Sequence, residues 1–271
     1  YGLTINWEAE VWINRILGSG TKVVVLERSP KGLKDICKVE VNDTLAGNLA
    51  GELLSKCIHK TGTVVIFTQK LIEGNDPNGA VCAKCLTEYC PDIRIVQVAM
   101  DLEIDQSTFI IETLKKYSDI VGVYATCARH THSLLKAMEQ TDIHLQAAIG
   151  SELFEESYQA LQGRRLDAVI DKRPELIGYD ALRLIFANLV KKEDLPISHK
   201  VSPRIILRAN SEMCYLAKEE ENYYGKEITG QGSQRSPGCR SADPYSSPER
   251  QGHRSHPGHH PSGREPLRPV L

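Results

Sequence analysis

The residues best placed to do chemistry are charged residues that directly follow a short apolar segment. Apolar residues 168–170 lead directly into Asp171, Lys172 and Arg173, and Pro174 follows at once. Proline suits the first turn of a helix, so the pattern predicts a buried strand, a charged exit and a helix start. Ligands of parallel α/β sheets bind beyond the carboxyl ends of the strands. We therefore expect Asp171 and Lys172 to face a binding cleft.

Cysteine is the second residue type that could carry chemistry. The chain has eight cysteines, and Cys82 and Cys85 form a CxxC pair of the kind used in redox or zinc sites. No second CxxC or paired histidine motif completes a zinc site. Cys82, Cys85, Leu86 and Tyr89 also repeat at the spacing of one helix face, which favours core packing. We expect no metal and no cofactor, and scattered free thiols favour a reducing, cytoplasmic compartment.

Apolar strands and amphipathic helices alternate along most of the chain. Because most of the strands are continuously apolar, this alternation of strands and helices predicts an α/β fold of parallel sheets with helices on both faces. Asn42, Asp43 and Thr44 supply a helix start after the second strand. The predicted strands are residues 23–26, 39–41, 64–67, 93–99, 120–125, 144–149, 167–170 and 204–207, and the later helices are 78–90, 106–117, 130–140, 153–162 and 175–191.

Composition excludes several classes of function. A charged fraction of 25% and a net charge of −2 offer no basic field for nucleic acid. No apolar run reaches the ~18–20 residues that span a bilayer, and we recognise no signal peptide. From about Ala217 the chain is rich in Gly, Ser, Pro, Arg and His, so we predict that residues 217–271 are disordered. The histidines of this tail could bind a metal ion weakly, but the composition favours a solvated tail.

Several segments together resemble the effector-binding core of the lactose-repressor (LacI) family of transcription regulators, which shares its fold with type I periplasmic sugar-binding proteins. The segments include "GTKVVVLERSP", "VEVNDTLAGNLAGELL", "RPELIGYDALRL" and "PRIILRAN", in the family's order across roughly residues 3–210. The resemblance implies a two-lobed clamp with doubly wound parallel sheets. The partial N-lobe would be residues 1–41 plus 174–198, and the C-lobe would be 43–171 plus 203–210.

The resemblance also implies which residues contact the ligand. In the family, polar side chains at the strand exits bind ligand hydroxyls. The matching positions here are Glu27, Arg28, Asp76, His130, Glu152 and Lys172. Asp76 stands near a position where the family carries arginine, which points to a changed or lost ligand. The family's DNA-binding helix-turn-helix and the first N-lobe strands have no match, so we expect an N-terminally truncated, incomplete N-lobe.

These observations lead to two functional hypotheses. The first is the sugar-sensing domain of a LacI-type regulator, cytoplasmic and homodimeric, which would contact DNA only through an absent N-terminal head. The alternative is the solute-binding protein of a sugar ABC transporter, a class that normally avoids many free thiols. No Gly-rich phosphate loop, nucleophile elbow or catalytic constellation occurs, so we do not expect an enzyme. The expected partner is a small-molecule effector, a sugar or sugar derivative, and no membrane.

Overall fold

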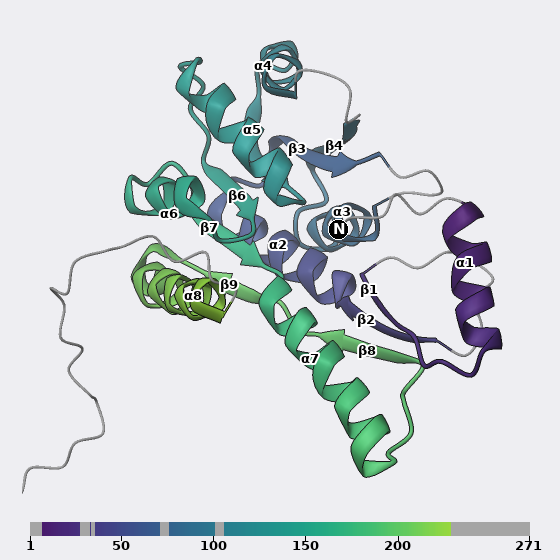
Figure 1. Cartoon of the computed structure of the whole chain (residues 1–271). Helices are drawn as coiled ribbons and strands as arrows, with labels where there is room; N and C mark the ends of the chain where they lie inside the picture. Colours follow the sequence, from purple (N-terminus) through teal and green to yellow (C-terminus); the bar gives the residue numbers. More distant parts are fainter. Residues whose placement is uncertain (1–6, 28–32, 34–35, 71–75, 101–105, 229–271) are drawn as a thin grey trace, which may run out of the picture.

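Two sheets organise the chain in the computed structural model (Figure 1). The structure describes residues 7–27, 33, 36–70, 76–100 and 106–228. Arg28 and the segment 229–271, which carries most of the predicted tail, lie outside the described residues. The described helices include none that is both long and apolar enough to cross a membrane.

The larger sheet has six strands and is parallel except at one edge. In spatial order they are β4 (Ile93–Met100), β3 (Gly62–Gln69), β5 (Ile120–Ala125), β6 (Ala147–Ser151), β7 (Ala168–Asp171) and β9 (Arg204–Ile206). Only β9 runs antiparallel, beside β7. Parallel neighbours end at the same edge of a sheet, so β3, β5, β6 and β7 all deliver their next residues to one side of the molecule.

Helices cover both faces of this sheet, as the continuous apolar strands predict. In β3, Val64 and Ile66 face one core and Val65 and Phe67 face the other, and all four are fully buried. One face carries α2 (Asp43–Cys57) and α3 (Pro77–Tyr89), and the other carries α4 (Gln106–Lys116), α5 (Ala128–Glu139), α6 (Glu155–Gln162) and α8 (Arg208–Ile228) (Figure 1). Cys82 and Cys85 lie buried on α3, which confirms the expectation of core packing.

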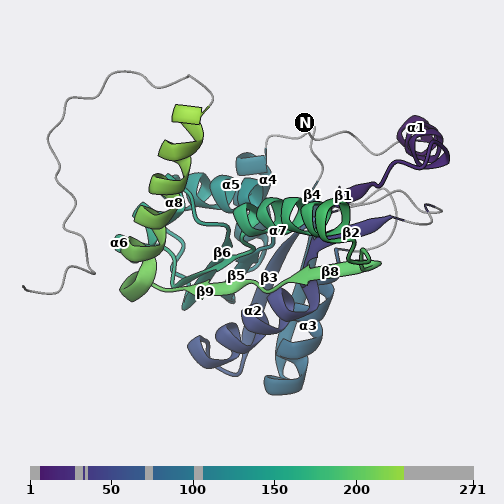
Figure 2. The ribbon, with the colours of Figure 1, turned by 60° about the horizontal axis from the view of Figure 1, so that its bottom comes forward.

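The smaller sheet has three parallel strands and a different burial pattern. Its order is β1 (Val24–Leu26), β2 (Cys37–Val41) and β8 (Ser198–Val201), and α7 (Pro174–Phe186) packs on it (Figure 2). Cys37, Val39 and Val41 are buried in the core shared with α7, whereas the residues between them are only partly buried. The chain reaches this sheet through α1 (Trp7–Gly18), and α7 continues as a π-helical turn, η1 (Ala187–Lys191).

The structure corrects three sequence predictions. The tail prediction was wrong over residues 217–228, because α8 continues to Ile228. That stretch, "AKEEENYYGKEI", is rich in the strong helix formers Ala, Lys and Glu, and the disorder-like composition begins only after it. Strand β8 was not predicted, since "SHKV" is short and alternates polar with apolar residues. The strand predicted at 144–149 is β6, Ala147–Ser151.

Candidate functional site

Four of the six predicted site residues gather at the carboxyl edge of the large sheet. Glu152 directly follows β6 and Lys172 directly follows β7, while His130 lies in the first turn of α5 after β5. Asp76 caps α3 in the connection after β3. Glu27 belongs to the other sheet, where it follows β1 and is exposed. The parallel register of the strands therefore brings together residues that are spread over about a hundred positions of the sequence.

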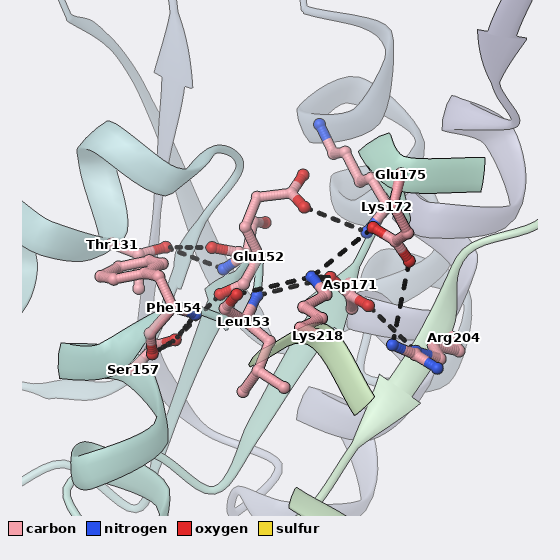
Figure 3. A network of polar contacts seen from close by, with 11 residues as sticks. Thr131, Glu152, Leu153, Phe154, Ser157, Asp171, Lys172, Glu175, Arg204 and Lys218 are labelled. Carbon is pink, nitrogen blue, oxygen red and sulfur yellow. Dashed lines mark hydrogen bonds and ion pairs between the residues drawn. The ribbon is translucent and has the colours of Figure 1, made fainter. Parts of the chain in front are cut away.

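Glu152 and Lys172 are in direct contact (Figure 3). The backbone N–H of Lys172 donates to Glu152 Oε2 at 3.4 Å. The Lys172 ammonium nitrogen lies 3.9 Å from Asp43 Oδ1, at the start of α2. Lys172 thus contacts Glu152 through its backbone and Asp43 through its ammonium group, so both charged side chains stand at this edge of the sheet.

The environment of Glu152 holds its carboxyl group close to half-protonation at neutral pH. Burial raises its pKa from 4.5 to about 7, and the neighbouring positive charge of Lys172 opposes that shift only in part. Burial disfavours the charged form of a carboxyl group because the interior solvates charge poorly. A group in this state can both donate and accept hydrogen bonds, which is what a sugar hydroxyl requires of its partner.

His130 is buried, and its burial favours the neutral form of the imidazole. Burial lowers its pKa, which the hydrogen bond to the backbone oxygen of Phe67 and the charge of Asp76 only partly oppose. The Nδ1–O distance is 3.3 Å, and a carbonyl oxygen can only accept, so Nδ1 carries the hydrogen. The remaining nitrogen, Nε2, is then left as an acceptor.

Asp76 directs its carboxylate into the protein. Its oxygens accept hydrogen bonds from Thr126 Oγ1 at 2.6 Å and from the backbone N–H groups of Asn78 at 3.1 Å and Gln69 at 3.3 Å. These bonds tie the exits of β3 and β5 to the start of α3, so Asp76 positions the edge on which the other predicted residues stand. That it contacts a ligand as well stays a prediction.

A buried ion-pair network beside this edge was missed at the sequence level (Figure 3). Asp171 is fully buried at the end of β7. Its carboxylate accepts from Arg204 Nε on β9 at 2.9 Å and from Lys218 Nζ on α8 at 2.7 Å. Glu175 in the first turn of α7 approaches the same two cations at 4.0 and 3.8 Å. Asp171 therefore joins β7, β9 and α8. The expectation that it faces a binding cleft was wrong, because its carboxylate is fully buried in these ion pairs.

A sequence signal for Lys218 did exist. Ser211, Cys214, Tyr215 and Lys218 repeat at the i, i+3, i+4 and i+7 positions of one helix face. Ser211 and Cys214 are buried, and the Lys218 side chain is only 16% exposed. The sequence prediction missed this pattern because it began the disordered tail at Ala217, before Lys218.

Three of the charged residues after strands adopt left-handed backbone conformations. Glu27, Glu152 and Arg173 have φ values of 62°, 67° and 59°. For residues other than glycine such conformations cost about 1 kcal/mol each and cluster at functional sites. Their occurrence at strand exits agrees with the side on which this class of fold binds its ligands.

The described residues also line two surface hollows. One, of about 430 Å³, lies between α7, β9 and α8, and the other, of about 290 Å³, lies between the end of α4 and β5. None of the five predicted residues that the structure describes lines either hollow. Within the part of the chain that the structure describes, no group of three His, Cys, Asp or Glu side chains could hold a metal ion.

The comparison with protein families decides the family of the chain. The model of the periplasmic binding protein domain matches residues 8–193, which include both sheets except β8 and β9. The chain belongs to this family. No curated protein matches the chain.

Solved structures of periplasmic binding proteins share the fold. GanP, a glucose-galactose binding protein from Geobacillus stearothermophilus, is 24% identical over 73% of this chain and 71% of its own, with a TM-score of 0.61. A solute-binding protein of an ABC transporter from Burkholderia graminis, in complex with D-arabinose, is 18% identical over 74% and 72%, with a TM-score of 0.66. A LacI transcriptional regulator from Bacteroides fragilis is 14% identical over 78% and 75%, with a TM-score of 0.65.

Proposed function

We propose that this chain is the ligand-sensing domain of a LacI-type transcription regulator and that its ligand is a small sugar or sugar derivative. The observation that carries the proposal is the contact of Glu152 with Lys172 at the edge where four strands of the large sheet end. His130 and Asp76 stand on the same edge. The domain itself would contact neither DNA nor a membrane and would catalyse no reaction.

The two sheets would be the two lobes of a clamp. The chain passes between them after Val41, after Asp171 and between Val201 and Arg204. In this division the predicted N-lobe, residues 1–41 and 174–198, would extend through β8 to Val201, and the predicted C-lobe, residues 43–171 and 203–210, would include α8. Lys172 and Asp43 belong to the first two crossings, so a ligand that binds Lys172 would act where the lobes hinge. Closure on a ligand shifts the equilibrium between open and closed states only through contacts that differ between them.

The chemistry of the edge suits a polyhydroxylated ligand. The lysine ammonium donates hydrogen bonds, the neutral histidine offers an acceptor nitrogen, and Glu152 can do either near its pKa of about 7. Solved relatives of the fold carry D-allose and D-arabinose, which supports a sugar as the ligand class. Glu27 and Arg28 would contribute from the N-lobe side of the clamp.

The thiols favour a regulator in the cytoplasm. Seven cysteines of the described residues are free, five of them buried. Exported proteins work in oxidising compartments, where free thiols are a liability. A homodimer would cover the exposed apolar side chains Leu182 and Phe186 of α7, which are 71% and 56% exposed.

The solute-binding protein of a sugar ABC transporter is the second candidate. Several of the similar solved structures are sugar-binding proteins of such transporters, which favours this alternative. Sedimentation velocity separates the two, because the regulator hypothesis requires a dimer and a freely diffusing solute-binding protein would sediment as a monomer.

A thermal-shift screen with neutral sugars and sugar phosphates tests the ligand class. A sugar that binds the folded state raises the unfolding midpoint by mass action. Lys172→Met should abolish the shift, and Lys136→Met, an exposed lysine on α5, should retain it. A shift that survives Lys172→Met unchanged would remove this edge as the binding site.

A further inference from the structure

The hollow between α7, β9 and α8 has the features of a binding site distinct from the edge described above. It is open to solvent and has a volume of about 430 Å³. Its lining residues are Arg173, Glu175, Leu176, Tyr179, Arg204, Ala217 and Lys218. Three of these are cationic, and two offer an apolar wall on α7. The hollow depends on α8, because Ala217 and Lys218 close one side of it.

Arg173 is the unusual member of this lining. Its Nε atom is buried and has no hydrogen-bond partner within the described part of the protein. Its backbone is also left-handed, with φ at 59°. A buried donor without a partner costs about 1–3 kcal/mol, more when the group is charged. A strained residue with an unmet guanidinium donor at a hollow is therefore a place where a ligand would recover free energy.

The other two cations are already engaged. Arg204 and Lys218 each bond the buried carboxylate of Asp171, and Glu175 lies within 4.0 Å of both. Three cations then face two carboxylates, which leaves a single positive charge at Arg173. The charge balance of the hollow favours a ligand with one negative charge over a dianion, because the second charge would have no cation to pair with and would be repelled by Glu175.

We propose that this hollow binds a small organic monocarboxylate whose apolar body lies against Leu176 and Tyr179. A planar guanidinium matches the two oxygens of a carboxylate through parallel N–H donors. Tyr179 is 64% exposed and Leu176 is half-buried, so both have surface to offer a ring or a short hydrocarbon. None of Asp76, His130, Glu152 or Lys172 lines the hollow, so the site is separate from the proposed sugar site.

Calorimetric titration of the full chain with three matched probes tests the proposal. Benzoate carries one carboxylate on a ring, benzamide is its neutral match, and phenyl phosphate is close to a dianion at pH 7. Because none of them is a sugar, failure of the proposed sugar site does not affect the result. We expect benzoate to bind at least about tenfold more tightly than benzamide, as expected for a hydrogen bond to a charged group. We also expect benzoate to bind more tightly than phenyl phosphate. Equal binding of benzamide, or tighter binding of phenyl phosphate, would overturn the assignment.

Matched variants place the site. Arg173→Met should weaken benzoate binding at least about tenfold, because the forked contact to the carboxylate is lost. Arg164→Met is the control, since Arg164 is also an arginine with a left-handed backbone, with φ at 57°, and it does not line the hollow. Tyr179→Ala removes a mostly exposed side chain, so the variant should fold, and it should weaken benzoate binding severalfold. Equal affinities of the Arg173→Met and Arg164→Met variants, or no effect of Tyr179→Ala, would refute the site.

Discussion

The two sheets are both built mainly of parallel strands, but they differ in how their two faces are buried. The large sheet has helices on both faces, and its interior strand β3 buries six consecutive residues, Thr63–Thr68. The small sheet has α7 on one face, and its central strand β2 alternates buried with partly buried positions. On the second face Lys38 and Glu40 replace the aliphatic residues that a doubly covered strand would carry, and Ser198 Oγ donates to Glu40 at 3.2 Å.

This difference teaches that a parallel sheet can carry a helix on one face only, as the described part of the chain does here, if its central strand alternates apolar with charged residues. Parallel sheets are normally buried on both faces and read as continuous apolar runs. Among the described residues, the exposed apolar side chains around the small sheet lie mainly on helices. They include Tyr179, Leu182 and Phe186 of α7 and Val11, Trp12 and Ile16 of α1.

The largest expected effect on stability comes from truncating one leucine in the core of each sheet. Leu54 on α2 is fully buried against the large sheet, and Leu184 on α7 is half-buried beside the small one. Leu54→Ala should lower the free energy of unfolding by about 2–5 kcal/mol. Leu184→Ala should cost about half as much or less, because it removes less apolar area from the core. Urea denaturation measures both, and equal losses would mean that the small sheet is packed as tightly as the large one.

Glu152 gives a pH-dependent test at the edge of the large sheet. Its folded pKa of about 7 is above the ordinary 4.5, so the folded state favours the protonated form. The associated stability is complete below about pH 4.5 and is lost as the pH rises through 7. Glu152→Gln, which is always neutral, should match the wild type at pH 4 and be more stable at pH 8 by up to about 3 kcal/mol, at about 1.36 kcal/mol per pKa unit.

Thermal unfolding at the two pH values checks this expectation. Glu156→Gln is the matched control on α6 and should show no such gain. A Glu152→Gln variant that is less stable than the wild type at pH 8 would contradict the buried, destabilised carboxylate.

Replacing one glycine beside each sheet by alanine should change the stability in opposite directions. A Cβ at Gly51 on α2 would stand 2.9 Å from the backbone oxygen of Cys82, because α2 and α3 pack closely there. Gly51→Ala should therefore destabilise by about 1–3 kcal/mol. Gly178 on α7 has no atom within 4 Å of the same position. Gly178→Ala should stabilise by about 0.5–1 kcal/mol, the usual gain from replacing glycine in a helix. Thermal denaturation measures both, and the same sign for both variants would be inconsistent with the packing described.

The same contrast explains how far the sequence predicted the fold. The large sheet was predictable because β3 and β7 are continuous apolar runs between helix patterns. The strand β8 was not, because Ser198–Val201 pairs with β2 across a separation of about 160 residues and has little apolar signal of its own. The period of local hydrophobicity cannot report a pairing over that distance.

The site was predictable to a similar, partial extent. Parallel strand order alone places Glu152 and Lys172 on one edge, and they are in contact. Pairing between Asp171 and Lys218 links residues 47 positions apart and requires α8 to return alongside β9. The neutral state of His130 and the raised pKa of Glu152 follow from burial, which depends on the assembled tertiary structure.

Small-angle X-ray scattering with and without the sugar that gives the largest thermal shift tests the central claim most directly. If the two sheets are lobes that close on a ligand bound near Glu152 and Lys172, a saturating concentration of that sugar should reduce the radius of gyration of the wild type. The Lys172→Met variant should show no reduction. An unchanged radius in the wild type at saturation, or no sugar that binds at all, would contradict the clamp.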